Sequence, residues 1–176
     1  QVPLQNPYVH GNAWFVDKIN YVDNANQELD GLAAIDLRHE AVADKKFEKQ
    51  LGTAVKQEST SMATLKSYEP NNLKYEVNSE KGGVLVFSEI YYPGWTATVD
   101  GQPVELGRVN YVLRAMNIKP GKHEVVLDFH PASINNTEAV AYTAYAILMV
   151  MAAFGVFMEW YKRHRKAKAL KTAKAA

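Results

Sequence analysis

The chain has 176 residues, enough for one domain of ordinary size with an appendage. Its formal net charge of +1 hides an uneven distribution, because seven of the 20 basic residues follow Tyr161 and no acidic residue does. Residues 1–138 carry 13 basic and 18 acidic side chains, so this part lacks the basic character of a folded nucleic-acid-binding domain. The sequence contains no cysteine, which excludes disulfides and thiolate metal sites.

The first sixty residues indicate irregular structure with short helical stretches. Asp23 or Asn24 is expected to cap a helix that runs to Ala34 and places three apolar side chains on one side (Leu29, Leu32 and Ala33). A second helical or mixed stretch is expected near residues 44–51. Residues 57–64 are rich in serine and threonine, so we expect a loop there or the start of a sheet.

From Met62 onward the apolar residues recur at every second position, which is typical of strands with one buried face. Asp100-Gly101 predicts a two-residue type I′ hairpin, because both central positions of that turn need positive φ, and Pro120-Gly121 predicts a further turn. The alternating side chains fall in short runs: Leu73, Tyr75 and Val77; Trp95, Ala97 and Val99; Tyr111, Leu113 and Ala115; and Val125, Leu127 and Phe129. About six short strands separated by turns predict a mainly β fold, an antiparallel β-sandwich that follows a short α-helical N-terminal part.

Residues Ala139–Met158 form a run of twenty positions without a charge. Twenty helical residues span about 30 Å, the thickness of the hydrocarbon core of a bilayer. Aromatic residues of the kind enriched at lipid headgroups flank the run (Tyr142 and Tyr145 at one end, Trp160 and Tyr161 at the other). The alternative, a buried helix of a soluble protein, is disfavoured by the basic segment that follows directly. We therefore expect one transmembrane helix in the lipid bilayer.

The basic tail sets the expected orientation. Basic segments beside a membrane helix stay in the cytoplasm, so residues 1–138 are expected outside the bacterial cytoplasmic (inner) membrane. The sequence starts at Gln1 without a signal segment that would direct this export. We therefore expect at least one membrane segment upstream and interpret the chain as the C-terminal piece of a larger membrane protein. Small residues on the span suit packing against the remaining transmembrane helices of that parent protein (Ala141, Ala144, Ala152, Ala153 and Gly155).

Two stretches resemble the YfhO family of bacterial multi-pass membrane proteins. The first combines Asn6-Pro7-Tyr8 and Gly11-Asn12-Ala13-Trp14-Phe15-Val16 with Ala41-Val42-Ala43-Asp44 further on. The second, FSEIYYPGWTATVDGQPVELGRVNYVLRAMNIKPGKHEVVLDFHP (Phe87 to Pro131), looks like the C-terminal end of that family, which also ends in a membrane helix. The ordered set of these elements is more specific than any one of them.

The resemblance implies a parent protein with many transmembrane helices and a GT-C-type glycosyltransferase fold. Such enzymes use lipid-phosphate-linked sugars to glycosylate cell-envelope polymers or other acceptors, and their catalytic acid lies in an early extracytoplasmic loop. This sequence has no counterpart of that loop, so we expect no catalytic residue in it. The chain is then an accessory part of the parent enzyme that helps to position a glycan or polymer acceptor.

Five residues are candidates for contact with an envelope glycan or lipid-linked sugar: Glu89, Tyr92, Trp95, Arg108 and Arg114. Tyr92 precedes Pro-Gly and is expected on an exposed loop. Trp95 offers an indole face to a sugar, but it also heads an alternating strand, which favours a core position. Arg108 and Arg114 offer planar guanidinium groups to a phosphate or carboxylate, with structural ion pairs as the favoured alternative. Glu89 follows an apolar strand and has no evident structural role.

We expect no metal and no cofactor in this chain. The five histidines show no metal-ligand spacing (His10, His39, His123, His130 and His164), and the glycines fall at turns rather than in a phosphate-binding loop. Asp100 is explained by its hairpin.

The expected segments are a mixed helical and irregular N-terminal part (1–60), a β-sandwich (61–132), a linker (133–138), the transmembrane helix (139–161) and a basic cytoplasmic tail (162–176). Two other functions stay open. A purely structural domain would stabilise the outer face of the membrane protein without contacting a ligand. A hydrolase would need two carboxylates that converge in a cleft, and the spacing of the acidic residues shows no such pair.

Overall fold

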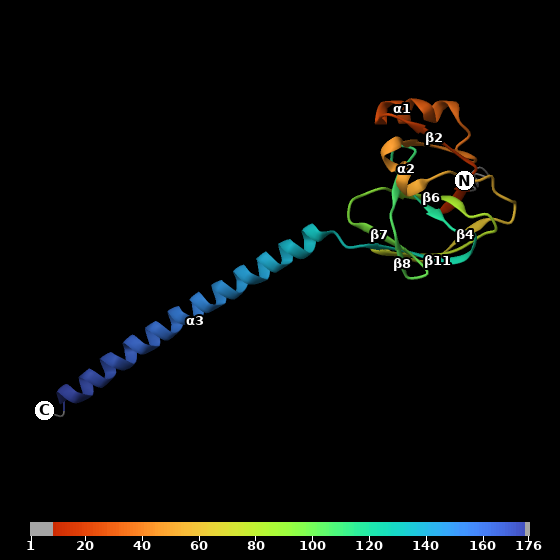
Figure 1. The fold of residues 1–176 in the computed structure, drawn as a ribbon. Coiled ribbons are helices and arrows are strands. Elements are labelled where there is room, and N and C mark those ends of the chain that lie inside the picture. The colour runs from red at the N-terminus through yellow and green to blue at the C-terminus, as the bar shows by residue number, and fades with distance from the viewer. Residues whose placement is uncertain (1–8, 175–176) are drawn as a thin grey trace, which may run out of the picture. The chain divides into compact units, whose positions relative to one another are not determined.

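A computed structural model describes residues 9–174 of the chain, so the Asn6-Pro7-Tyr8 motif lies outside the described residues. The chain divides into two compact units, one that ends at Pro131 and one that begins at Ala132. The first unit, called the β domain below, contains every strand that the structure describes, and the second is the single helix α3 (Ala132–Lys174) (Figure 1). Because α3 begins at Ala132, residues 133–138, expected as a linker, are helical.

The β domain is an antiparallel sandwich of two sheets with one further pair of strands, which confirms the predicted fold class. The first sheet has the order β1-β6-β10-β9: Ala13–Val16, Gly83–Ile90, Leu113–Ile118 and Gly107–Val109. The second has the order β4-β5-β11-β7-β8: Met62–Glu69, Asn72–Ser79, Gly121–Phe129, Trp95–Val99 and Gln102–Val104. The remaining pair, β2 (Lys18–Val22) and β3 (Glu40–Asp44), is parallel, whereas only antiparallel strands were expected.

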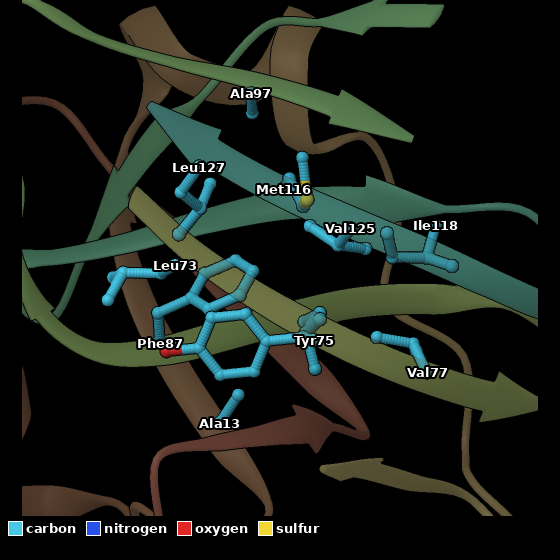
Figure 2. Packing of buried hydrophobic residues seen from close by; sticks show 11 residues of the cluster. Ala13, Leu73, Tyr75, Val77, Phe87, Ala97, Met116, Ile118, Val125 and Leu127 are labelled. Atoms are coloured by element: carbon cyan, nitrogen blue, oxygen red, sulfur yellow. The ribbon is translucent and has the colours of Figure 1, made fainter. Parts of the chain in front are cut away.

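Apolar side chains from both sheets fill the space between them (Figure 2). The alternating residues of β5, Leu73, Tyr75 and Val77, are all buried there, as their period of two predicts. Phe87 on β6 is fully buried and meets the Tyr75 ring edge-on, with ring centroids 5.1 Å apart. The contact between these two rings therefore joins the two sheets at the centre of the core.

The N-terminal part of the chain covers the outer face of the first sheet. A second apolar cluster lies there, and it includes Leu51 from α2 (Glu48–Leu51), Ala41 from β3 and Val86 from β6. Figure 1 shows the resulting layers, with α1 (Ala25–Gly31), β2 and α2 stacked on the sheet that contains β6. The N-terminal part also supplies β1, which pairs with β6, so this part of the chain contributes a strand to the sandwich.

The short helical stretches lie where the sequence predicted them. Asn24 caps α1 by accepting a hydrogen bond from the N–H of Gln27, and a 3₁₀ turn, η1 (Leu32–Ala34), follows. Asp44 caps a second 3₁₀ turn, η2 (Lys45–Phe47), directly before α2. The apolar face expected for α1 is wrong in one respect, because Leu29 is 53% exposed while its neighbour Glu28 is fully buried.

Two hairpin turns place residues in the left-handed region. Asp100 (φ 50°) and Gly101 (φ 76°) form the predicted two-residue turn between β7 and β8, with Val99 paired to Gln102. The second turn joins β9 to β10 and contains Asn110 (φ 50°) and Tyr111 (φ 70°). Sequence alternation placed Tyr111 in a strand, and the structure corrects this.

A histidine–aspartate pair joins β11 to the turn between β7 and β8. His123 Nδ1 lies 2.6 Å from Asp100 Oδ2, and His123 Nε2 lies 3.3 Å from the carbonyl oxygen of Pro120. The hydrogen bond to Asp100 raises the pKa of His123. The same bond, together with the backbone N–H of Glu124, lowers the pKa of Asp100. The pair is therefore arranged for a charged imidazolium, which donates from both nitrogens.

The Asp100→Asn variant is expected to lose a stabilising contribution that depends on pH. Asparagine tolerates the turn and keeps an acceptor for the Glu124 N–H, but it removes the charge that holds the proton on His123. A group with a raised pKa stabilises the fold fully below its unfolded pKa, about 6.5 for histidine, and this contribution is lost as pH rises through the folded pKa. The variant should therefore lose more free energy of unfolding at about pH 5.5 than at about pH 8.5. Urea unfolding in detergent micelles measures both differences, and equal losses at the two pH values would contradict this coupling.

Helix α3 contains a segment, Thr137–Arg165, that is long and apolar enough to cross a membrane. The expected span at Ala139–Met158 lies within it. Lys162, Arg163 and Arg165 follow the apolar run, and Lys162 pairs with Glu159 at 3.7 Å. The side chains of the other basic residues of the tail lie outside the described part of the structure (Lys166, Lys168, Lys171 and Lys174).

Candidate functional site

A groove of about 660 Å³ lies at one edge of the β domain. It is formed by the loop between β6 and β7, the first residues of β7, the end of β8 with the two residues after it, and one residue of α2. The lining residues are Gln50, Tyr91, Tyr92, Pro93, Gly94, Trp95, Thr96, Ala97, Pro103, Val104, Glu105 and Leu106. Of the five residues singled out in the sequence, Tyr92 and Trp95 lie in this groove.

The conformation of the loop between β6 and β7 is fixed at both ends. The N–H of Tyr91 donates to the carbonyl oxygen of Val112, 2.7 Å away, where β6 ends. Gly94 has φ 103°, and a Cβ atom there would lie 2.9 Å from the Pro131 side chain, so only glycine fits. The loop therefore presents Tyr92 to solvent, with 61% of its surface exposed, as its place before Pro-Gly predicts.

Trp95 packs against the core and also lines the groove, so it combines the two positions considered for it. It is half-buried and packs against the core cluster between the sheets, as the alternation in β7 predicts. Its ring lies 5.2 Å from that of Phe129 on one side, and the guanidinium carbon of Arg114 lies 4.0 Å from the ring centroid. The same residue lines the groove. Trp95 is thus an aromatic wall of the groove that the core holds in place.

Arg114 and Glu89 form an ion pair behind this tryptophan, at a distance of 3.2 Å between Nη2 and Oε2. Arg114 is 1% exposed, and burial lowers its pKa. Among the residues that the structure describes, its Nε and Nη1 have no hydrogen-bond partner. Burial and the charge of Glu89 raise the pKa of nearby Tyr75 to about 12. Neither Arg114 nor Glu89 lines the groove, so the pair supports Trp95 from within the sandwich.

Arg108 lies elsewhere, in a second ion pair. Its Nη2 lies 2.7 Å from Oε2 of Glu28, a side chain with no exposed surface. The other carboxylate oxygen of Glu28 accepts the N–H of Tyr111 at 2.8 Å, which stabilises the left-handed turn between β9 and β10. Arg108 also lies over the ring of Phe47, which in turn packs edge-on against Tyr91 of the groove. Arg108 therefore reaches the groove only through an aromatic neighbour.

Sequence reasoning missed Glu28 and the polar residues of the groove, Gln50 and Glu105. Gln50 carries a buried Oε1 atom without a hydrogen-bond partner in the described part of the chain. The local sequence does not distinguish these residues. Glu28 and Gln50 sit among other polar or charged residues, and Glu105 alternates with the apolar Val104 and Leu106 as an ordinary exposed residue would.

The described residues contain no group of three or more histidine, aspartate or glutamate side chains arranged to hold a metal ion. A second hollow of about 450 Å³ lies along β1, where the rings of His10 and Trp14 stack and His39 pairs with Asp17 at 2.8 Å. None of the five predicted contact residues lines it.

Comparison with protein families shows that most of the motifs singled out in the sequence lie within a known family model. A family model described as bacterial membrane protein YfhO matches residues 35–140, more than half of the chain. The chain belongs to the YfhO family. The match spans the whole lining of the groove, from Gln50 to Leu106, and reaches the beginning of the apolar segment of α3. No curated protein and no solved structure is detectably similar to this YfhO-family chain.

Proposed function

We propose that the β domain is the accessory outer domain of a multi-pass bacterial envelope protein, a glycosyltransferase that uses lipid-linked sugars, and that its groove binds the glycan or polymer acceptor. The observation that carries this proposal is the groove itself, which brings together the exposed ring of Tyr92 and the supported indole of Trp95.

The chemistry of the groove suits a sugar. Aromatic faces contact the apolar faces of pyranose rings, and three aromatic residues, Tyr91, Tyr92 and Trp95, line the groove. The carboxylate of Glu105 supplies a hydrogen-bond acceptor for hydroxyls, and Gln50 adds a polar side chain to the lining. A volume of about 660 Å³ is in the range of small-molecule sites, about 300–1,000 Å³, and has room for a short oligosaccharide.

Charge supports an outer location for the groove. By the positive-inside rule, the basic end of α3 is expected in the cytoplasm and the acidic β domain on the other side of the inner membrane. Lipid-linked sugars and envelope polymers are met on that outer face. In this proposal the catalytic acid belongs to another part of the parent protein, and the β domain orients the acceptor without taking part in bond cleavage.

Binding of an oligosaccharide to the groove is expected to change the fluorescence of Trp95 and to depend on Tyr92. The chain has three tryptophans, so Trp14→Phe and Trp160→Phe leave Trp95 as the only one. In nanodiscs, titration of this chain with purified cell-envelope oligosaccharides should give a saturable shift, and Tyr92→Ala should weaken binding by about tenfold through loss of one aromatic contact.

The matched control is Tyr68→Ala, because Tyr68 is exposed to a similar extent as Tyr92 (64% against 61%) but does not line the groove. Its affinity should equal that of the parent chain. Absence of any Trp95 response over the oligosaccharide panel, or equal weakening by both alanine variants, would contradict the proposal.

The second candidate is a purely structural domain, which the packing of Trp95 against Phe129 and Arg114 favours. In that case Tyr92→Ala and Trp95→Phe would leave glycan transfer by the whole parent protein unchanged.

A further inference from the structure

We propose that one end of the β domain, carrying Tyr68, Ile90, Tyr92, Tyr111 and Val112, is a lipid-contacting surface that rests in the headgroup layer of the bilayer. All five side chains are at least 40% exposed. This set is called the apolar end below.

Strand register places these residues at the same end of the sandwich. In the second sheet, Tyr68 pairs with Leu73 where β4 ends and β5 begins. In the first sheet, Ile90 pairs with Leu113 where β6 ends and β10 begins, and the turn with Tyr111 and Val112 directly precedes Leu113. These ends of the two sheets face each other, because Arg114 at the start of β10 contacts the ring of Trp95 at the start of β7.

The chain leaves the β domain at the same end. Phe129, the last residue of β11, pairs with Trp95, and the next N–H, that of His130, donates to Gly94 at 2.9 Å. Pro131 then packs against Gly94. The apolar membrane segment begins at Thr137, six residues later, which is at most about 20 Å of chain in any conformation. The exit point is therefore held within reach of the lipid headgroups.

The composition of the apolar end matches that layer. Every exposed tyrosine among residues 9–131 lies there, namely Tyr68, Tyr92 and Tyr111. Tyrosine is enriched at headgroup depth because its ring is apolar and its hydroxyl is polar. Glu69 and His130 are exposed nearby, which suits headgroups rather than hydrocarbon. At the opposite end Met62 and Val55 are exposed, but the turns carry Glu80, Lys81, Asp100 and Lys119.

The absence of cysteine from the sequence allows a direct test with single labels on the full chain. The variants Tyr68→Cys and Ile90→Cys place a fluorophore at the apolar end, and Glu80→Cys and Gln102→Cys place it at the opposite end. The two ends are separated by the length of β11, nine residues or about 30 Å. Each labelled chain is reconstituted in nanodiscs of phosphatidylcholine and phosphatidylglycerol, with and without lipids that carry a quenching doxyl group near the headgroup.

Doxyl lipids should quench the labels at Tyr68 and Ile90 at least about twice as strongly as the labels at Glu80 and Gln102, since only the apolar end is expected within the headgroup layer. Equal quenching at all four positions would overturn the proposal. Aqueous iodide provides the second measurement. Labels at the apolar end that are protected from both iodide and doxyl lipids would show that protein, rather than lipid, covers this surface, and would also overturn it. Neither result depends on whether a glycan occupies the groove.

Discussion

Replacing Arg108 with methionine will lower the free energy of unfolding of the β domain by about 3–5 kcal/mol. Methionine keeps most of the apolar volume but leaves the carboxylate of Glu28, which has no exposed surface, without its cationic partner. Removal of one member of a buried pair is costly because the other charge stays buried. Since Glu28 also accepts the N–H of Tyr111, the damage should reach the left-handed turn before β10. Urea unfolding in micelles, followed by circular dichroism, measures the loss.

Lys18→Met is the matched control for this effect. It removes the cation from a pair with Glu40 that is solvent-exposed, with 61% of the Lys18 side chain accessible. Such pairs contribute at most about 1 kcal/mol. Adding Glu28→Gln to the Arg108→Met variant should recover part of the lost stability, because the buried charge is then removed. If Arg108→Met is as mild as Lys18→Met, Glu28 does not depend on Arg108 for its burial.

Truncation of Phe87 to alanine is the second large effect, with an expected loss of about 3–5 kcal/mol. Phe87 is fully buried between the sheets, and its ring is the edge-on partner of Tyr75. Alanine leaves a cavity at the centre of the core in Figure 2, and strands on both sides restrict its collapse.

The neighbouring position provides the control, because Ser88 lies on the same strand but is exposed. Ser88→Ala should change the free energy of unfolding by no more than about 0.5 kcal/mol. A small loss for Phe87→Ala would mean that the two sheets close around the missing ring, and near-ultraviolet circular dichroism of Tyr75 would then report a changed environment.

Local sequence chemistry predicted those parts of the fold that depend on neighbouring residues. Asp100-Gly101 forms the expected hairpin because its φ values are a property of two adjacent residues. The alternation of Leu73, Tyr75 and Val77 predicts a strand with one buried face, and these three side chains are buried on one face of β5. The helix cap at Asn24 follows from its own side chain and the N–H of Gln27.

The other parts of the fold depend on pairing between segments far apart in the sequence, which local patterns do not predict. β1 and β6 are about seventy residues apart in sequence, and neither segment contains a pattern that indicates pairing with the other. The first sheet is covered on both faces, so Ala115 and Met116 are both buried and a period of two cannot distinguish inside from outside. The burial of Glu28 in place of Leu29 is decided by Arg108, eighty residues later.

The residues of the candidate site that lie close together in sequence were predictable, and those brought together by the fold were not. Tyr92 and Trp95 lie in one short loop and strand, and both line the groove. Arg114 and Glu89 form an ion pair, as favoured for the arginines from the sequence, but their position behind Trp95 depends on how the two sheets face each other. Gln50 reaches the groove from α2, a contact that requires the whole N-terminal layer to be in place.

The position of β11 has a consequence for the order in which the domain folds. β11 is the last strand in the sequence but the central strand of the second sheet, paired with β5 on one side and β7 on the other. Until residue 129 has been synthesised, β5 and β7 each expose an unpaired edge, which is prone to pair with other chains. Sandwiches of this kind also fold slowly, because their contacts join distant parts of the chain. A nascent β domain therefore reaches its folded state only when the apolar helix is next to emerge, so that folding and membrane insertion compete in time.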